Sequence, residues 1–306
     1  ETWDEGVRII RLPVLFHLSK GVIMPSMPTV AWSLIAEADV VNLHVPQVDA
    51  DLIGLLCKLR KKPLVLTYHC DLMMPEGLIN QLAGKMAAFA NFISAVLADR
   101  IVHNTHDFAE HSDFLTRFLG KLVVIQRPIV VKSVSDEDIR RFCEKYEIEP
   151  DQKVVGMAAR LATEKGVEFL VQAMPLVIQS IPNARAVFLG DFQNVFGEES
   201  YKQKLLPLIN ELGSKWNFLG ILSEQEKAVF YHVCKVLVLP SINSTESFGM
   251  VQVEAMSCGT PVVATDLPGV RQPVLTTGMG KIVPTRDHQA LAQAIIVVLE
   301  SNDLVK

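Results

Sequence analysis

The sequence predicts an α/β protein of two doubly wound domains, each built around a parallel sheet. Short apolar runs rich in Val and Ile alternate with longer segments of helical periodicity, which is the pattern of βαβ units. The runs are apolar almost throughout, as strands covered on both faces must be. The length of 306 residues suits two domains, at about 150 residues each.

The first domain is expected to contain five strands and three helices. The apolar runs that predict the strands are residues 7–12, 40–45, 64–68, 100–104 and 122–125. The segments with helical periodicity are residues 50–61, 78–97 and 108–118. The apolar stretch 86–98 contains Asn91 and Ser94. Because it is shorter than the roughly 20 residues that cross a bilayer, we interpret it as part of a buried helix.

A charged stretch interrupts the alternation. Residues 133–150 contain the acidic run Asp136-Glu137-Asp138, and Ser135 stands where a helix cap is expected. We interpret this stretch as a linker with a short helix. The predicted domains are therefore residues 1–133 and residues 134–306.

The second domain repeats the alternation with six strands and five helices. Its expected strands are residues 154–158, 186–189, 216–219, 236–239, 261–264 and 280–283. Its expected helices are residues 167–180, 201–212, 223–234, 248–257 and 289–299. Sheets of this kind bind ligands beyond the carboxyl ends of their strands, and a cleft between two such domains suits a reaction of two substrates.

Composition and charge argue against several classes of protein. The net charge of −5 gives no reason to expect nucleic acid as a partner. The five cysteines are scattered without a CxxC pair, which argues against a disulfide framework and a zinc site and favours the cytoplasm. The acidic start of the sequence is unlike a signal peptide, and no apolar run approaches the length of a membrane span.

Two glutamates flank the start of a predicted helix in the second domain. An apolar strand ends at Pro240, a polar loop carries Glu246, and Glu254 lies eight residues later, within the helix. At about 100° per residue, this spacing returns to nearly the same helix face, so both carboxylates can address one ligand. The helix start also offers free N–H groups that suit phosphate. The alternative is a capping glutamate followed by a surface glutamate.

Two cations follow the first strand of the second domain. Arg160 and Lys165 lie in residues 156–166, which read GMAARLATEKG. Two cations on a loop at the carboxyl end of a strand suit an anionic ligand, and fixed cations can take the place of a divalent metal there. Charge-assisted contacts of this kind contribute roughly 1.5–3 kcal/mol each. An isolated Arg160 would more often be a surface residue.

Residues 246–269 read ESFGMVQVEAMSCGTPVVATDLPG and resemble the donor-site signature of the family-4 retaining glycosyltransferases. Members of that family have the GT-B fold, in which two Rossmann-like domains face a cleft. The resemblance implies that Glu246 binds hydroxyls of the transferred sugar and that Glu254 binds the ribose of the nucleotide. It also implies that Phe248, Gly249 and Met250 lie at the donor.

The resemblance extends to three further segments of the second domain. The R-x4-K-G spacing implies that Arg160 and Lys165 clamp the diphosphate. Gly190 matches a strand-end glycine that lets the donor approach, although Phe192 stands where the family often has a second glycine. Leu222 matches the segment around the nucleobase, with core packing as an equal alternative.

In the first domain, the resemblance points to His69, which directly follows the strand at residues 64–68. The family commonly carries a histidine here that faces the sugar or the acceptor, whereas a lone histidine at a strand end would more often be structural. His44 ends the preceding strand. The basic run Lys58-Leu59-Arg60-Lys61-Lys62 is explained either by cations at a helix C-terminus or by contact with anionic lipid.

The first domain is also expected to be incomplete. Members of the family begin with a strand, a glycine-rich loop and a helix ahead of the stretch that matches residues 7–12, and they end with a helix that runs back over the first domain. We therefore expect a chain truncated at both ends and a first sheet with an edge that needs cover.

The predicted function is retaining transfer of a hexose-type sugar from a UDP-, GDP- or ADP-sugar to a lipid-linked or saccharide hydroxyl, without a cofactor or divalent metal. Two alternatives stay open: a non-catalytic nucleotide-sugar-binding module, and a nucleotide-sugar epimerase of the same fold. The predicted location is the cytoplasm, including the inner membrane surface. The candidate catalytic residues are His69, Arg160, Lys165 and Glu246, and the donor-binding set adds Gly190, Leu222, Phe248, Gly249, Met250 and Glu254.

Overall fold

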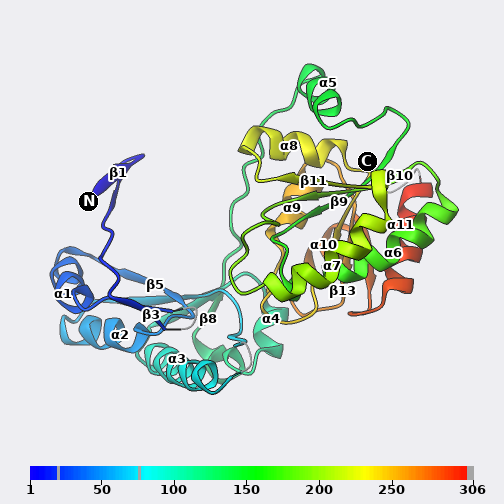
Figure 1. Ribbon diagram of the computed structural model, residues 1–306. Coiled ribbons are helices and arrows are strands. Elements are labelled where there is room, and N and C mark those ends of the chain that lie inside the picture. The colour runs from blue at the N-terminus through cyan, green and yellow to red at the C-terminus, as the bar shows by residue number, and fades with distance from the viewer. Residues whose placement is uncertain (19–20, 75–76, 302–306) are drawn as a thin grey trace. The chain divides into compact units, whose positions relative to one another are not determined.

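The chain forms two compact units, Glu1–Gln126 and Arg127–Lys306. The computed structural model describes residues 1–18, 21–74 and 77–301, and Figure 1 shows its helices and strands. The sequence pattern places the boundary near residue 133, whereas residues 127–133 group with the second unit. Each unit contains a parallel sheet with helices, which confirms the predicted α/β class.

The first unit is built on a four-stranded parallel sheet. Its strands, in order across the sheet, are β5 (Val41–Val45), β6 (Leu64–Tyr68), β7 (Arg100–His103) and β8 (Leu122–Val124). Helices α2 (Ala50–Leu59) and α3 (Leu78–Leu97) connect the first three strands and pack against each other. The inward residues Leu43, Leu66 and Ile101 lie in the core of this unit. The four strands expected between residues 40 and 125 are thus confirmed.

The strand expected at residues 7–12 does not join this sheet, so that prediction was wrong. Strand β2 (Val7–Ile9) pairs antiparallel with β1 (Thr2–Asp4), and Val7 is exposed. Glu5 and Gly6 connect the two strands with φ values of 43° and 83°, the positive values that a tight hairpin turn requires. Strands β3 (Phe16–Leu18) and β4 (Gly21–Ile23) also pair antiparallel, and helix α1 (Met27–Glu37) follows.

The single helix expected at residues 108–118 is also wrong, because two helical segments occupy this region. Helix α4 (His106–His111) ends at Ser112, and a 3-10 helix, Leu115–Lys121, follows. Ser112 has an extended backbone, and its Oγ accepts a hydrogen bond from the N–H of Leu115 at 3.2 Å. The serine side chain replaces a backbone carbonyl as acceptor and starts a new turn.

The second unit is built on a six-stranded parallel sheet. The strands, in order across the sheet, are β11 (Trp216–Gly220), β10 (Ala184–Leu189), β9 (Lys153–Ala158), β12 (Val236–Leu239), β13 (Val262–Thr265) and β14 (Gly280–Val283). All six were expected from the sequence, with small shifts at their ends. The chain proceeds outward from β9 through β10 to β11 and then returns to the other side of β9 with β12, so the strand order reverses between β9 and β12.

Helices cover both faces of this sheet, as its strand composition requires (Figure 1). One face carries α6 (Val167–Ser180), α7 (Glu199–Glu211) and α11 (His288–Glu300), and the other carries α5 (Asp136–Lys145), α8 (Glu224–Val233), α9 (Met250–Ser257) and α10 (Gln272–Thr277). Residues of β9 point to the two faces of the sheet in turn. Val155 and Met157 pack toward α6, whereas Val154 and Ala158 pack toward α8. Burial on both faces explains why the strands are apolar throughout.

The predicted cap of α5 is confirmed. The Ser135 Oγ accepts a hydrogen bond from the Asp138 N–H at 3.2 Å, and the Asp138 carboxylate accepts one from the Ser135 N–H at 3.0 Å. This reciprocal capping box satisfies two N–H groups at the helix start. Helix α10 was not predicted, because its 6 residues are too few for helical periodicity to show.

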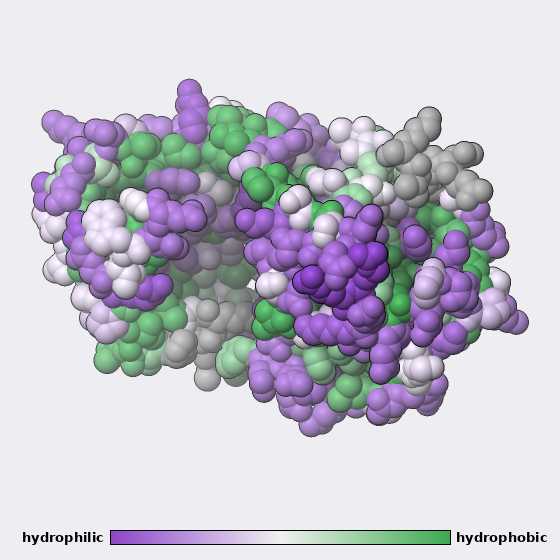
Figure 2. All heavy atoms as spheres, turned by 90° about the horizontal axis from the view of Figure 1, so that it is seen from above, coloured by the Kyte–Doolittle hydropathy of each residue, from purple (hydrophilic) through white to green (hydrophobic). Residues whose placement is uncertain are grey.

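Apolar side chains also remain at the surface. On the face drawn in Figure 2, apolar residues (green) lie among hydrophilic ones (purple), which is normal for a folded protein. Within the described part of the chain, every helix is too short or too polar to span a membrane.

Candidate active site

The two loops that carry the predicted diphosphate and sugar contacts meet where the strand order reverses. One follows β9 and carries Arg160 and Lys165; the other follows β12 and carries Glu246. Because β9 and β12 are parallel neighbours, their carboxyl ends lie at the same edge of the sheet. The reversal point at this edge is where open α/β sheets bind ligands.

Close backbone packing joins these two loops. The Ile242 N–H donates a hydrogen bond to the Glu164 carbonyl at 3.1 Å. Gly166 has a φ of +64°, and a Cβ at this position would lie 2.1 Å from the Pro240 carbonyl oxygen. Only glycine fits so close to the neighbouring backbone. Gly166 therefore sets the distance between the loop of Lys165 and the loop of Glu246.

Lys165 and Glu246 form an ion pair across the two loops. The Lys165 Nζ lies 2.8 Å from the Glu246 Oε2, and their side chains are only 19% and 16% exposed. Arg160 differs, because its side chain is 64% exposed and its Nη2 lies 3.3 Å from Glu164 on the same loop. The structure thus holds Lys165 firmly and leaves Arg160 largely in solvent.

The loop after β10 borders the same edge. Gly190 has a φ of +136°, and a Cβ there would lie 2.0 Å from the Ala159 carbonyl oxygen. The Leu161 N–H donates to the Asp191 carbonyl at 2.8 Å, which ties this loop to the loop of Arg160. Phe192, which stands where the family often has glycine, stacks on Phe218 with ring centroids 4.2 Å apart. Its ring is therefore anchored on the apolar layer of α6.

The start of α9 differs from the expected one. The helix begins at Met250 with Gly249 as its N-cap, two residues after the expected start, and Glu246 lies on the preceding loop, as predicted. The argument from helical spacing therefore does not apply between Glu246 and Glu254. Phe248 is buried, and the Gln252 side-chain amide donates to the Phe248 carbonyl at 2.9 Å. This bond fixes the backbone at the step from Phe248 to Gly249.

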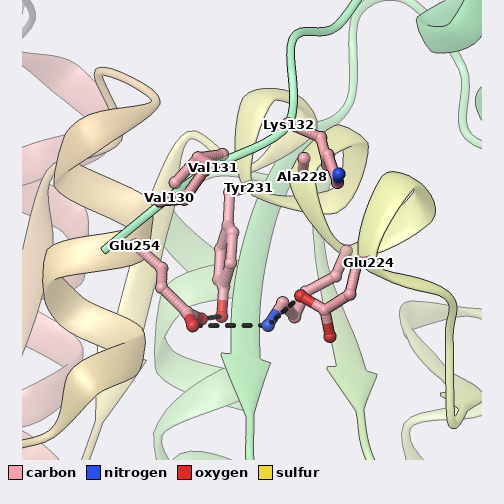
Figure 3. Close-up of a pocket in the computed structure, with 8 residues that line it drawn as sticks. Val130, Val131, Lys132, Glu224, Ala228, Tyr231 and Glu254 are labelled. Carbon is pink, nitrogen blue, oxygen red and sulfur yellow. Dashed lines mark hydrogen bonds and ion pairs between the residues drawn. The ribbon is translucent and has the colours of Figure 1, made fainter. Parts of the chain in front are cut away.

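Glu254 is bound by two side chains of the neighbouring helix α8 (Figure 3). The Tyr231 hydroxyl donates to its Oε2 at 2.5 Å, and the Lys227 Nζ lies 3.3 Å from its Oε1. Burial, and then the hydrogen bond to Glu254, raise the pKa of Tyr231, which therefore remains a donor. The prediction missed both partners. Their spacing of four residues on a predicted helix was the available signal, because it places them on one face.

Leu222 packs against the apolar layer formed by α5, α8 and α9. It follows β11, at the far edge of the same sheet from β14. Part of the Leu222 side chain is therefore used in core packing, which was the alternative role for this residue.

In the first unit, His69 lies at the carboxyl end of β6 beside His44 of β5. The His44 Nδ1 and the His69 Nε2 are 2.8 Å apart, and the rings stack with centroids 5.0 Å apart. Asn42 extends this polar row, since its Nδ2 lies 3.3 Å from the His44 Nε2. Thr67 donates to the Asn42 Oδ1 at 2.8 Å. The row forms one polar stretch of the sheet surface.

The basic run at the end of α2 is divided between two environments. Arg60 places its guanidinium 3.7 Å from the centre of the Trp32 ring, a cation–π contact. Lys58, Lys61 and Lys62 line a surface pocket next to the end of α3. The three lysines therefore form a local basic surface.

Among the described residues, no three His, Cys, Asp or Glu side chains gather in a way that could hold a metal ion. The chain contains two Asp-x-Asp sequences, Asp49-Ala50-Asp51 and Asp136-Glu137-Asp138. Both stand at helix starts, where carboxylates complement the helix dipole.

Two curated relatives match just under half of the chain at moderate identity. A phosphatidyl-myo-inositol mannosyltransferase of Mycobacterium leprae is 33% identical over 142 residues, which are 46% of this chain and 35% of the relative. A D-inositol 3-phosphate glycosyltransferase of Corynebacterium urealyticum is 35% identical over 156 residues, which are 49% of this chain and 36% of the relative. The matched stretch thus spans about a third of the length of these relatives.

Solved structures show the same fold over most of the chain. HepE of Anabaena, in complex with UDP-glucose, has a TM-score of 0.73 at 24% identity and covers 91% of this chain and 74% of its own. Sucrose-phosphate synthase from Thermosynechococcus elongatus has a TM-score of 0.71 at 23% identity and covers 92% and 70%. These similarities confirm the expected GT-B fold class.

The family match covers most of the second unit. Residues 138–306 match the family described as Glycosyl transferases group 1. This stretch contains the loops after β9, β10 and β12 and the helices that carry Lys227, Tyr231 and Glu254. Because the match takes in more than half of the chain, the chain belongs to the group 1 glycosyl transferases.

Proposed function

We propose that the protein containing this chain transfers a hexose-type sugar from a nucleoside-diphosphate sugar to a hydroxyl group, with retention of configuration. The supporting observation is the ion pair of Lys165 and Glu246 at the reversal point of the second sheet, on loops that also carry Arg160. A cation and a carboxylate held together suit the two parts of such a donor, an anionic diphosphate and a neutral ring of hydroxyls.

In the proposed reaction, the bond between the anomeric carbon and the diphosphate breaks, and the acceptor oxygen forms its bond from the same face. Lys165 and Arg160 stabilise the charge that develops on the leaving diphosphate. An oxygen of that diphosphate takes the acceptor proton, so no protein carboxylate forms a lasting bond to the sugar. Glu246 accepts hydrogen bonds from the transferred sugar, and Glu254 accepts them from the ribose.

The remaining candidates are assigned to positioning. His69 orients the sugar or the acceptor, with His44 as its hydrogen-bonding neighbour at 2.8 Å. The donor-contact set comprises Gly190, Leu222, Phe248, Gly249 and Met250. Since Phe248 is buried, its backbone is the part proposed to face the donor.

The protein is expected to transfer sugar without a divalent metal, because Arg160 and Lys165 supply the positive charge. The measurement is release of nucleoside diphosphate by the full-length protein from UDP-, GDP- and ADP-sugars, with and without EDTA. UDP-glucose is tested first, because HepE is solved with it. Loss of transfer in EDTA, restored by manganese or magnesium, would contradict the prediction. Binding without release would indicate the non-catalytic module, and donor interconversion without acceptor would indicate the epimerase.

We further propose a lipid-linked acceptor and contact between the first unit and an anionic membrane surface. The outer face of α3 exposes Leu78, Leu82, Met86 and Phe89, each by more than half. Their spacing of four, four and three residues places them in one stripe, and exposed apolar stripes mark interaction surfaces. A relative is named for a phosphatidylinositol acceptor, and a saccharide acceptor is the alternative.

A pocket beside α3 supports this proposal. Its lining is mainly apolar and includes Met24, Leu72, Met74 and Ala87. Asp49 is the acidic residue in the lining, and burial raises its pKa. An acceptor with a hydrocarbon chain would suit these walls better than a saccharide would.

The α3 stripe is expected to mediate vesicle binding. The double change Leu82→Asp with Met86→Asp places charge where acyl chains would lie, so it should abolish co-sedimentation with vesicles of anionic phospholipid. Leu275→Asp is the matched control, because Leu275 is similarly exposed on a helix of the second unit. Unchanged co-sedimentation of the double variant, or no binding by the unaltered protein, would contradict the membrane proposal and favour a saccharide acceptor.

A further inference from the structure

We propose that Tyr231 and Lys227 are positioning residues that hold the Glu254 carboxylate ready for the ribose hydroxyls. This inference rests on the proposed function, in which Glu254 binds the ribose. It assigns a role to two residues of α8 that the donor signature does not contain. The three side chains line one small pocket of the second unit (Figure 3).

Each oxygen of the Glu254 carboxylate has its own donor on α8. The Tyr231 hydroxyl donates to Oε2 at 2.5 Å, and the Lys227 Nζ lies 3.3 Å from Oε1. An ionised carboxylate offers about four acceptor positions. These two contacts leave about two of them for a ligand, which matches the two adjacent hydroxyls of a ribose.

The tyrosine is a rigid donor. Its side chain belongs to the apolar layer of α8 and is 1% exposed. The Thr260 Oγ1 donates to the Tyr231 carbonyl at 2.5 Å, which ties the backbone of α8 to the segment before β13. A glutamate has three rotatable side-chain bonds, and ordering them on binding costs free energy. A carboxylate already held by Tyr231 avoids part of that cost.

Lys227 adds a positive charge and a second contact that orients the Glu254 carboxylate. Its Nζ lies 2.8 Å from Glu224, which is largely in solvent, as well as 3.3 Å from Glu254. Burial alone would lower the pKa of Lys227, but the hydrogen bond to Glu224 and the charge of Glu254 outweigh it and raise that pKa. Lys227 thus stays charged and attracts the Glu254 carboxylate on its Oε1 side.

The segment that precedes the linker completes the pocket wall. Val130, Val131 and Lys132 run across it, on the side of Tyr231 and Ala228 (Figure 3). All of these residues belong to the second unit. The arrangement can therefore be tested by nucleotide binding alone, without an acceptor.

The experiment compares each nucleoside diphosphate with its 2′,3′-dideoxy form. The probes are UDP, GDP and ADP, and their affinities for the full-length protein are measured by titration calorimetry. The variants are then measured with the nucleotide that binds most tightly. For the unaltered protein, we expect the dideoxy form to bind about tenfold more weakly, as loss of hydrogen bonds to a carboxylate requires. Glu254→Gln should remove most of this difference.

Tyr231→Phe should weaken binding of the ribonucleotide about three- to tenfold and leave the dideoxy form unchanged. The double variant with Glu254→Gln should bind no more weakly than Glu254→Gln alone, because Tyr231 acts through Glu254. Lys227→Met should behave like Tyr231→Phe, and it tests the proposal independently if Tyr231→Phe does not fold, since Lys227 is less buried.

Tyr201→Phe is the matched control. Tyr201 is a partly buried tyrosine on α7 whose hydroxyl likewise donates to a glutamate, Glu168 of α6. The Tyr201→Phe variant should leave the affinity for the ribonucleotide and the affinity for its dideoxy form unchanged. Equal weakening of both nucleotide forms by Tyr231→Phe and Lys227→Met, or no effect of either, would overturn the positioning role. A ribose preference that survives Glu254→Gln, or no nucleotide binding at all, would instead contradict the proposed function.

Discussion

Glu246→Gln is expected to lower turnover by about a hundredfold or more while leaving the affinity for free nucleoside diphosphate nearly intact. Charge-assisted hydrogen bonds contribute about 1.5–3 kcal/mol each, and a loss of about 3 kcal/mol corresponds to roughly a hundredfold in rate. Glutamine keeps the size of the side chain, and its carbonyl oxygen can still accept from Lys165, 2.8 Å away in the native pair. Lys165 therefore stays in place for the diphosphate.

Glu254→Gln is the comparison variant for this prediction. Glu254 lies on α9 beside Tyr231 and Lys227, away from the Lys165 pair. Since both a free nucleotide and a nucleotide-sugar contain the ribose, this change should weaken both ligands alike. The measurements are turnover with the donor and calorimetric affinity for the bare nucleoside diphosphate. If Glu246→Gln weakens the bare nucleotide as much as Glu254→Gln does, the proposed division of roles is wrong.

Lys165→Ala and Arg160→Ala are each expected to weaken nucleoside diphosphate binding by at least about tenfold, or about 1.4 kcal/mol. The two side chains differ in their exposure to solvent and in their partners. Lys165 is the partner of the largely buried Glu246, whereas Arg160 is mostly in solvent. Both variants should lose turnover, and Lys165→Ala should lose more, because removing Lys165 also leaves Glu246 without its cation.

Lys204→Ala is the control for the change of charge, because Lys204 is exposed on α7. It should leave the affinity unchanged. The corresponding nucleoside monophosphate is a second control, since it lacks the outer phosphate and should be less sensitive to both cations. Unchanged affinity of Lys165→Ala and Arg160→Ala for the diphosphate would remove the clamp from the mechanism.

Much of the fold follows from local sequence patterns. Strands covered on both faces must be apolar along their length, so β6, β12 and β14 were predicted with the bounds that they have. The Ser135 capping box was likewise predictable, since both partners lie within one turn of α5. The errors fall where a few local bonds compete with periodicity, as at Ser112, or where a short apolar strand pairs only with its neighbour, as in the hairpin of β1 and β2.

The sequence by itself determined which segments carry Arg160, Lys165, Glu246 and Glu254, because the loop or helix that holds each residue follows a recognisable strand. Only the tertiary structure decided which of these side chains meet. Lys165 and Glu246 are 81 residues apart, and their contact depends on β12 returning to lie beside β9. The engagement of Glu254 by Tyr231 likewise depends on two helices packing on one face of the sheet. Strand order and helix packing arise from burial summed over the whole unit, and no local pattern encodes them.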